Sequence, residues 1–268
     1  VLDTTVPAWI RAATDVIDPA HTLFLVSSKS GGTIETMAGY SYFLGLVENA
    51  VGSDSAGQSF VAITDQGSPL DGLAQEKGFR RTFLNPKDIG GRYSVLSYFG
   101  LVPAALMGLD LGKLLDRADS MRTRCASSVP AQSNPGARLG AALGSLALKG
   151  RDKLTLVASS STSGFGLWAE QLIAESTGKE GRGIVPVVGE TLTGPDFYGD
   201  DRLFVHLRLE GDDNVSADDA LGRLETSAQP VLRLELRDRY DLAAEFFRWQ
   251  FATAVAGAIL DIQPFDQP

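Results

Sequence analysis

The stretch TLFLVSSKSGGTIET, residues 22–36, decides how this chain is interpreted. Its first five residues are mostly apolar and β-prone, as expected of a short buried strand. A loop of serines and glycines follows, and a helix is predicted from Thr33 to about Val47. A strand, a Ser/Gly loop and a helix in this order are typical of a parallel sheet covered by helices. The predicted fold class is therefore α/β.

The same scheme continues outward from this stretch. Further strands are predicted at residues 60–64, 81–84, 153–158, 184–188, 203–209 and 231–236. Helices are predicted from Ser68 to Gly78, over 92–107 with a kink at Pro103, ahead of residue 153, from 164 through 175, and over 242–260. The loop SSSTSG at 159–164 repeats the strand–loop–helix order.

A polar, proline-containing segment at residues 127–136 is the best candidate for a domain boundary. We therefore expect two tandem α/β/α sandwich units with mainly parallel sheets, over residues 1–126 and 127–268. The chain begins with Val1 rather than Met, and we expect it to be a piece of a longer polypeptide that lacks the beginning of the first unit and the end of the second.

Composition narrows the class of function. Apolar residues make up 44% of the chain and charged residues 21%, which is enough for a packed core. The net charge of −9 argues against a non-specific nucleic-acid binder, because a broad cationic face is missing. Cys125 is the only cysteine, so an oxidising compartment is not required. No apolar run reaches the roughly 18 residues of a membrane span.

The Ser/Gly loop suits a phosphate group. Its glycines let the backbone turn N–H groups toward an anion, and the start of the following helix adds partial positive charge. It is neither a Walker A loop nor a dinucleotide fingerprint. An ordinary strand-to-helix turn is an equally good interpretation of the loop alone.

Two further segments carry candidate chemistry. Gly90-Gly91-Arg92 places a permanently charged guanidinium at a predicted helix start, where it could steady an oxyanion; a plain surface arginine is the alternative. Gln171 and Glu175 are four residues apart and should share a helix face. A carboxylate near the negative end of a helix is a better proton acceptor, although a solvated face is the simpler interpretation. Lys179 could face the phosphate or solvent, and solvent is the simpler expectation.

Three motifs together resemble the glucose-6-phosphate isomerase family, which has the sugar-isomerase (SIS) fold. They are SKSGGTIET at 28–36, GGRYSVLS at 90–97 and WAEQLIAESTGK at 168–179. The resemblance implies interconversion of glucose 6-phosphate and fructose 6-phosphate through a cis-enediolate, in the cytoplasm, by a homodimer and without a metal or other cofactor.

The resemblance also assigns roles to individual residues. Glu175 would be the catalytic base, and Arg92 would stabilise the enediolate. The residues that it assigns to substrate binding are Ser28, Lys29, Ser30, Thr33, Gly91, Gln171 and Gln267.

Two departures from the family pattern stand out. A lysine expected shortly after the C-terminal FDQP segment, residues 265–268, is beyond the end of this chain. A ring-opening histidine has no clear equivalent: His206 fits a satisfied structural histidine within a strand, and His21 an exposed loop.

These departures keep two alternatives open. The chain could be a phosphosugar-binding module or a fragment without turnover. The segment after Leu209 also resembles the isomerase half of bifunctional transaldolase/glucose-6-phosphate isomerases, which would place a transaldolase domain on the same polypeptide.

Overall fold

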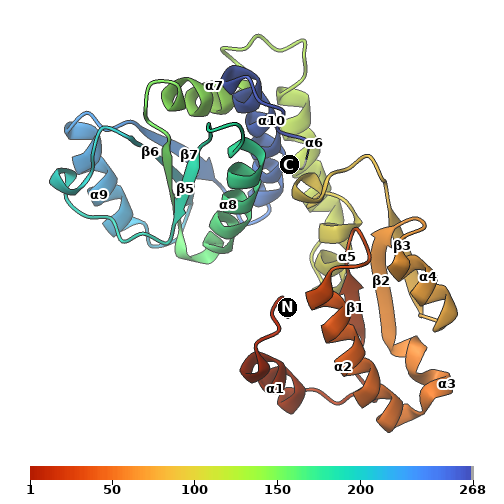
Figure 1. Ribbon diagram of the computed structural model, residues 1–268. Coiled ribbons are helices and arrows are strands. Elements are labelled where there is room, and N and C mark those ends of the chain that lie inside the picture. The colour runs from red at the N-terminus through yellow and green to blue at the C-terminus, as the bar shows by residue number, and fades with distance from the viewer. Residues whose placement is uncertain (267–268) are drawn as a thin grey trace. The chain divides into compact units, whose positions relative to one another are not determined.

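A computed structural model describes residues 1–266 of the chain, so the predicted substrate contact Gln267 lies outside the described residues. The chain divides into two compact units (Figure 1), one from Val1 to Gly108 and the other from Leu109 onward. Each unit contains one sheet, and every strand pairing in both sheets is parallel. The predicted α/β class with two tandem parallel-sheet units is confirmed.

The first unit is built on a three-stranded sheet in the order β1-β2-β3. Its strands are β1 Phe24–Ser27, β2 Phe60–Asp65 and β3 Arg81–Asn85. Its helices are α1 Pro7–Val16, α2 Ile34–Val51, α3 Ser53–Ala56, α4 Pro69–Glu76 and α5 Tyr98–Leu106. Because β1 and β3 both pair with β2 in parallel, the loops that follow all three strands emerge at one edge of the sheet.

The core of the first unit lies between this sheet and two helices. Phe60 of β2 packs among residues of α2 and α4, including Tyr40 and Leu70. Its ring stacks on Phe24 of β1 at a centroid distance of 5.1 Å. A monotonic strand order with right-handed crossovers puts α2 and α4 on the same face, which agrees with this shared cluster.

The second unit is built on a four-stranded sheet in the order β5-β4-β6-β7. Its strands are β4 Lys153–Ala158, β5 Val185–Val188, β6 Arg202–Leu209 and β7 Val231–Leu236. Its helices are α6 Leu111–Arg124, α7 Pro135–Ala147, α8 Gly164–Thr177, α9 Val215–Thr226 and α10 Asp241–Leu260. Helix α9 covers one face, and α8 and α10 lie on the other (Figure 1).

Several helices begin where local sequence chemistry places them. Ser68 accepts the backbone N–H of Asp71 at 3.1 Å, and Pro69 follows as the first residue of α4. Asn134 caps α7 in the same way, accepting from Ala137 at 2.9 Å. These side-chain oxygens satisfy donors that the first helical turn leaves unpaired.

One predicted helix is wrong at its start. Residues 92–97 are not α-helical: a short 3-10 turn covers Gly91–Tyr93, and α5 begins only at Tyr98. The hydroxyl of Ser94 bonds the carbonyl of Gly91 at 2.7 Å, and that of Ser97 bonds the carbonyl of Ser94 at 2.5 Å. Serine hydroxyls that bond nearby carbonyls compete with the helical pattern, which explains the difference.

The division between the units also differs from the predicted boundary. It falls after Gly108, whereas the sequence places it after residue 126. The reason is α6, which was not predicted and which packs against α10 of the second unit. Among the described residues, none of the helices combines the length and apolarity needed to cross a membrane.

Candidate active site

The loop that follows β1 is held by its own hydroxyl groups. Ser28 is 6% exposed, and its Oγ lies 2.9 Å from Oγ1 of Thr33 and accepts the N–H of Gly31 at 3.1 Å. Gly31 has a φ of +70°, and a Cβ there would lie 2.6 Å from the backbone nitrogen of Leu70. A glycine is therefore required at this turn.

Thr33 is the residue before α2 but does not cap it in the usual way. Within the described chain its hydroxyl makes no cap hydrogen bond to α2 and is paired with Ser28 instead. The side chain of Thr33 therefore does not cap the first N–H groups of this 18-residue helix. The start of α2 thus lies at the carboxyl edge of the sheet, where the sequence predicts a phosphate, and the hydroxyls of the loop bond within the loop.

Lys29 links all three loops at that edge. Its ammonium forms an ion pair with Asp65 at the end of β2 and donates to the carbonyl of Lys87, beyond β3, at 3.4 Å. The side chain of Lys29 is 29% exposed and that of Asp65 is 19% exposed. An arriving phosphate would therefore meet a cation that already has a carboxylate partner.

Arg92 is held in the segment between β3 and α5. The residue is 8% exposed, so it is not the surface arginine of the alternative interpretation. It sits in the 3-10 turn Gly91–Tyr93, whose position is fixed by the hydroxyl of Ser94 described above. A buried guanidinium is costly unless its donors are used, so this position has a specific structural or chemical purpose.

In the second unit, α8 carries the predicted base. The amide of Gln171 donates to Oε1 of Glu175 at 3.0 Å, and both residues are exposed. The prediction that the two share a helix face is confirmed. The hydrogen bond orients the carboxylate, since an amide one turn earlier restricts its rotamers.

Lys179 does not face solvent, contrary to the prediction. Its side chain is 9% exposed and its ammonium contacts the segment that follows α10. It donates to the carbonyl of Gln263 at 2.5 Å, to the carbonyl of Asp266 at 2.8 Å and to the carboxylate of Asp266.

The second Ser/Gly loop, after β4, is hydrogen-bonded to a carboxylate from the segment after β6. Asp212 accepts the N–H of Ser161 at 2.9 Å and the hydroxyl of Ser160 at 3.2 Å. The N–H of Ser161, followed by the serine hydroxyls, lowers the pKa of Asp212. Arg239 donates to the hydroxyl of Ser161 at 3.1 Å. Two donors of this loop, the hydroxyl of Ser160 and the N–H of Ser161, are therefore used by Asp212.

The two histidines behave differently. His21 is exposed, as predicted, and its Nδ1 lies 2.8 Å from Asp18. His206 is fully buried in β6, but neither ring nitrogen has a hydrogen-bond partner among the described residues, so it is not the satisfied histidine that was expected. Asp218 of α9 is 3.6 Å from its Nδ1, and burial lowers the pKa of His206.

A family model described as phosphoglucose isomerase matches residues 6–200, a range that includes all three motifs of the sequence. This chain belongs to the phosphoglucose isomerase family. The sequence-based resemblance is thereby confirmed at the level of the family.

Two relatives show how far the sequence similarity of this chain extends. A glucose-6-phosphate isomerase of Rubrobacter xylanophilus is 32% identical over 98% of this chain and 69% of its own length. One of Leptospira biflexa is 30% identical over 91% of this chain. The part of the Leptospira protein that this chain matches is only 62% of that protein's length.

A solved structure shares the fold closely. A hypothetical protein of Thermus thermophilus superposes with a TM-score of 0.84 at 25% identity, over 100% of this chain and 73% of that one. A solved tagatose-6-phosphate ketose/aldose isomerase of Escherichia coli also shares the fold, with a TM-score of 0.56 at 15% identity, over 97% of this chain and 74% of that one. This is the predicted SIS fold.

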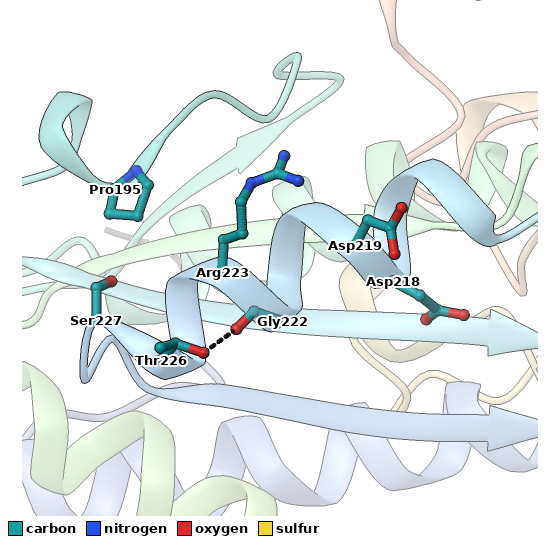
Figure 2. A pocket seen from close by; sticks show the side chains of 7 residues that line it. All are labelled: Pro195, Asp218, Asp219, Gly222, Arg223, Thr226 and Ser227. Carbon is teal, nitrogen blue, oxygen red and sulfur yellow. Dashed lines mark hydrogen bonds between the residues drawn. The ribbon is translucent and has the colours of Figure 1, made fainter.

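Two cavities of the described chain lie away from the predicted site residues. One of about 610 Å³ is open and lies along α9 (Figure 2), where Asp218 and Asp219 give it negative charge and Pro195 faces the end of the helix. Another, of about 510 Å³, lies between α6 and α10, and its basic and acidic side chains nearly balance. The first lacks the surplus of positive charge that a phosphate requires, and in the second five basic side chains are offset by four acidic ones.

Sequence reasoning missed two residues of the candidate site. Asp65 directly follows a predicted strand but was not connected with Lys29, from which it is separated by 36 positions. Asp212 lies in an unassigned segment beyond β6. A lone acidic residue directly after a parallel strand is a weak signal for a partner at the same sheet edge. Asp65 showed this signal in the sequence, and Asp212 did not.

Proposed function

We propose that this phosphoglucose isomerase family member interconverts glucose 6-phosphate and fructose 6-phosphate. The observation that supports the proposal best is the loop after β1, where Ser28, Ser30 and Thr33 surround the start of α2 at the carboxyl edge of the sheet. Hydroxyls and backbone donors at a helix start suit a phosphate dianion. Lys29 would neutralise part of its charge, with Asp65 setting the position of the ammonium.

The proposed chemistry moves one proton between neighbouring carbons. Glu175 takes the proton from C2 of the open-chain aldose phosphate and returns it to C1, while the hydroxyl proton on O2 is transferred to O1. Gln171 holds the carboxylate of Glu175 in the orientation that reaches both carbons. Arg92 offsets the negative charge of the enediolate, and Gly91 and Gln267 complete the substrate contacts.

The phosphate would contribute to catalysis although it does not react. Its binding to the loop of residues 28–33 would hold C1 and C2 in register with the base, so binding energy remote from the reacting carbons would lower the barrier. The isomerisation step consists of proton transfer and charge stabilisation, and the proposal assigns both to the chain's own donors and one carboxylate.

We further propose that each unit is one SIS-type domain and that the active enzyme is a homodimer. The tandem repetition of strand, Ser/Gly loop and helix supports the first proposal. The second rests on the family resemblance, as does a transaldolase domain on the same polypeptide.

Replacement of Glu175 tests the proposal. In a coupled assay of fructose 6-phosphate conversion, we expect Glu175→Gln to lower kcat by roughly 100- to 10,000-fold, the usual contribution of a general base. Binding of the sugar phosphate, followed by calorimetry, should change little because the shape of the side chain is retained.

Glu170→Gln is the matched control, since Glu170 is also exposed on α8. It should leave kcat unchanged. Full activity of Glu175→Gln would contradict the assignment of the base. Tight binding of fructose 6-phosphate by a wild-type chain without turnover would favour the phosphosugar-binding module instead.

A further inference from the structure

Lys179 is unusual among the lysines of the described chain because its ammonium has three oxygen partners on one short segment. The partners are the carbonyl of Gln263, the carbonyl of Asp266 and the carboxylate of Asp266. An ammonium has three N–H donors, so these contacts can use all of them. The segment 263–266 is therefore held at both ends by one side chain.

The backbone around Lys179 is rigid enough to hold this position. Its N–H donates to the carbonyl of Arg182 at 3.0 Å, and the N–H of Arg182 donates back at 2.9 Å. Between them, Glu180 and Gly181 both adopt positive φ, at 55° and 73°. The turn places Lys179 directly beyond Gly178, which ends α8.

The same turn also holds the end of α10. Arg182 donates to the carbonyl of Leu260, the last residue of that helix, at 2.6 Å. A cation at the carbonyl end of a helix is favourable because it satisfies free carbonyls and opposes the helix dipole. Two cations of one turn thus bind the end of α10 and the segment that leaves it.

The segment is also fixed from the side of α10. Pro264 lies against Gly257, where a Cβ would be only 2.7 Å from Cγ of the proline. A segment that packs closely on a helix backbone and is bound by a buried ammonium has one defined path. That path runs from the end of α10 toward residue 267.

We propose that Lys179 is a positioning residue of the active site, which fixes the segment 263–266 leading into Gln267 against the end of the helix that carries Gln171 and Glu175. This inference rests on the proposed function. Lys179 touches neither substrate nor reacting atoms in this role. It acts by holding two parts of the site that are 84 or more positions apart in the sequence in fixed register.

Substitution of Lys179 tests the role through kcat and KM measured separately. We expect Lys179→Met to lower kcat for fructose 6-phosphate conversion by roughly 10- to 100-fold, because small displacements of a positioned group have large effects on rate. Lys179→Arg should recover most of the loss, since a guanidinium can also donate to carbonyl and carboxylate oxygens. Lys153→Met, at an exposed lysine with ion pairs to Asp152 and Asp201, is the matched control and should retain wild-type kcat.

Two further measurements separate positioning from general stability. Amide hydrogen exchange of residues 263–266 should be faster in Lys179→Met, while exchange in β4 and β6 stays slow. If Lys179→Met fails to fold, Asp266→Asn tests the same contact, because its largely exposed side chain can be replaced without loss of the fold. This variant should also lower kcat, but by less than Lys179→Met. The double variant should be no worse than Lys179→Met, because both substitutions act through one contact.

The outcomes distinguish this inference from the proposed function. Wild-type turnover with unchanged kcat in both Lys179→Met and Asp266→Asn would overturn the role of Lys179 and leave the isomerase proposal intact. Faster exchange at 263–266 without loss of kcat would also overturn it, because the segment would then be held for stability alone. Absence of turnover in the wild type would overturn the proposed function and, with it, this role.

Discussion

Two adjacent glycines in the loop after β1 have very different surroundings. Gly31 has positive φ, and a Cβ there would contact the backbone nitrogen of Leu70 at 2.6 Å and the hydroxyl of Ser68 at 2.8 Å. A Cβ at Gly32 would meet no heavy atom within 4 Å. Substitution of Gly31 therefore measures the cost of a side chain that clashes with its neighbours, and substitution of Gly32 measures the loss of a glycine without a clash.

We expect Gly31→Ala to destabilise the first unit by about 2–4 kcal/mol, from backbone strain and overpacking together. Gly32→Ala should change the free energy of unfolding by less than about 1 kcal/mol. Urea unfolding followed by circular dichroism measures both values. Equal effects of the two substitutions would contradict the close approach at Gly31.

Individual contacts were the hardest part of the site to predict. The spacing of Gln171 and Glu175 predicted a shared helix face, because four residues make about one helical turn. The partners of Lys29, Lys179 and Asp212 are 36 or more positions away in the sequence. Nothing local indicates which cation meets which carboxylate across such separations, so these pairings required the structure.

At the scale of elements, α7 and α10 pack through glycines. A Cβ at Gly140 of α7 would lie 2.5 Å from the carbonyl of Ala252 and 2.6 Å from Cβ of Val255, both in α10. Gly222 of α9 is also helical, but a Cβ there would meet nothing within 4 Å, in keeping with its place on the open cavity (Figure 2). One helical glycine is thus needed for packing and the other is not.

Opposite effects follow for the two helices. Gly140→Ala should destabilise the second unit by about 2–4 kcal/mol, because backbone atoms cannot give way. Gly222→Ala should stabilise it by up to about 1 kcal/mol through helix propensity. Urea unfolding can be followed by the fluorescence of Trp168 and Trp249, which both lie in this unit. Destabilisation by Gly222→Ala would show that α9 is packed more tightly than the structure indicates.

Strands were predicted better than helices. The bounds of β4 and β7 agree with the prediction at both ends, since short runs of branched apolar residues between polar turns define them locally. The start of α5 was wrong because serine side chains bond nearby carbonyls. The helices α6 and α9 were not predicted, although the apolar residues of α6 recur at helical spacing.

At the scale of the whole molecule, two buried groups make stability depend on pH in opposite directions. Burial raises the pKa of Glu245 in α10 to about 7 from its ordinary value of 4.5. Its contribution to stability is complete below pH 4.5 and is lost as the pH rises toward 7, because the unfolded chain releases this proton first. Burial lowers the pKa of His206, so its contribution is present above about pH 6.5 and is lost on acidification.

Glu245→Gln isolates the first effect. Relative to the wild type, this variant should gain about 3 kcal/mol in free energy of unfolding between about pH 4.5 and pH 8, the equivalent of the change in pKa. Urea unfolding at several pH values measures the difference. Glu235→Gln, at an exposed side chain, is the control and should follow the wild type. A constant difference between Glu245→Gln and the wild type at all pH values would contradict the burial effect.

The carboxylate of Asp212 in the loop after β4 has a consequence for the chain as a tandem repeat. The second copy of the strand–loop–helix unit already contains a counter-charge encoded in the polypeptide, so an incoming anion would have to expel a residue that cannot diffuse away. An anion that binds the second loop would therefore compete with Asp212 for the N–H of Ser161 and the hydroxyl of Ser160. A duplicated architecture can in this way keep two similar frames while giving their loops different affinities for anions.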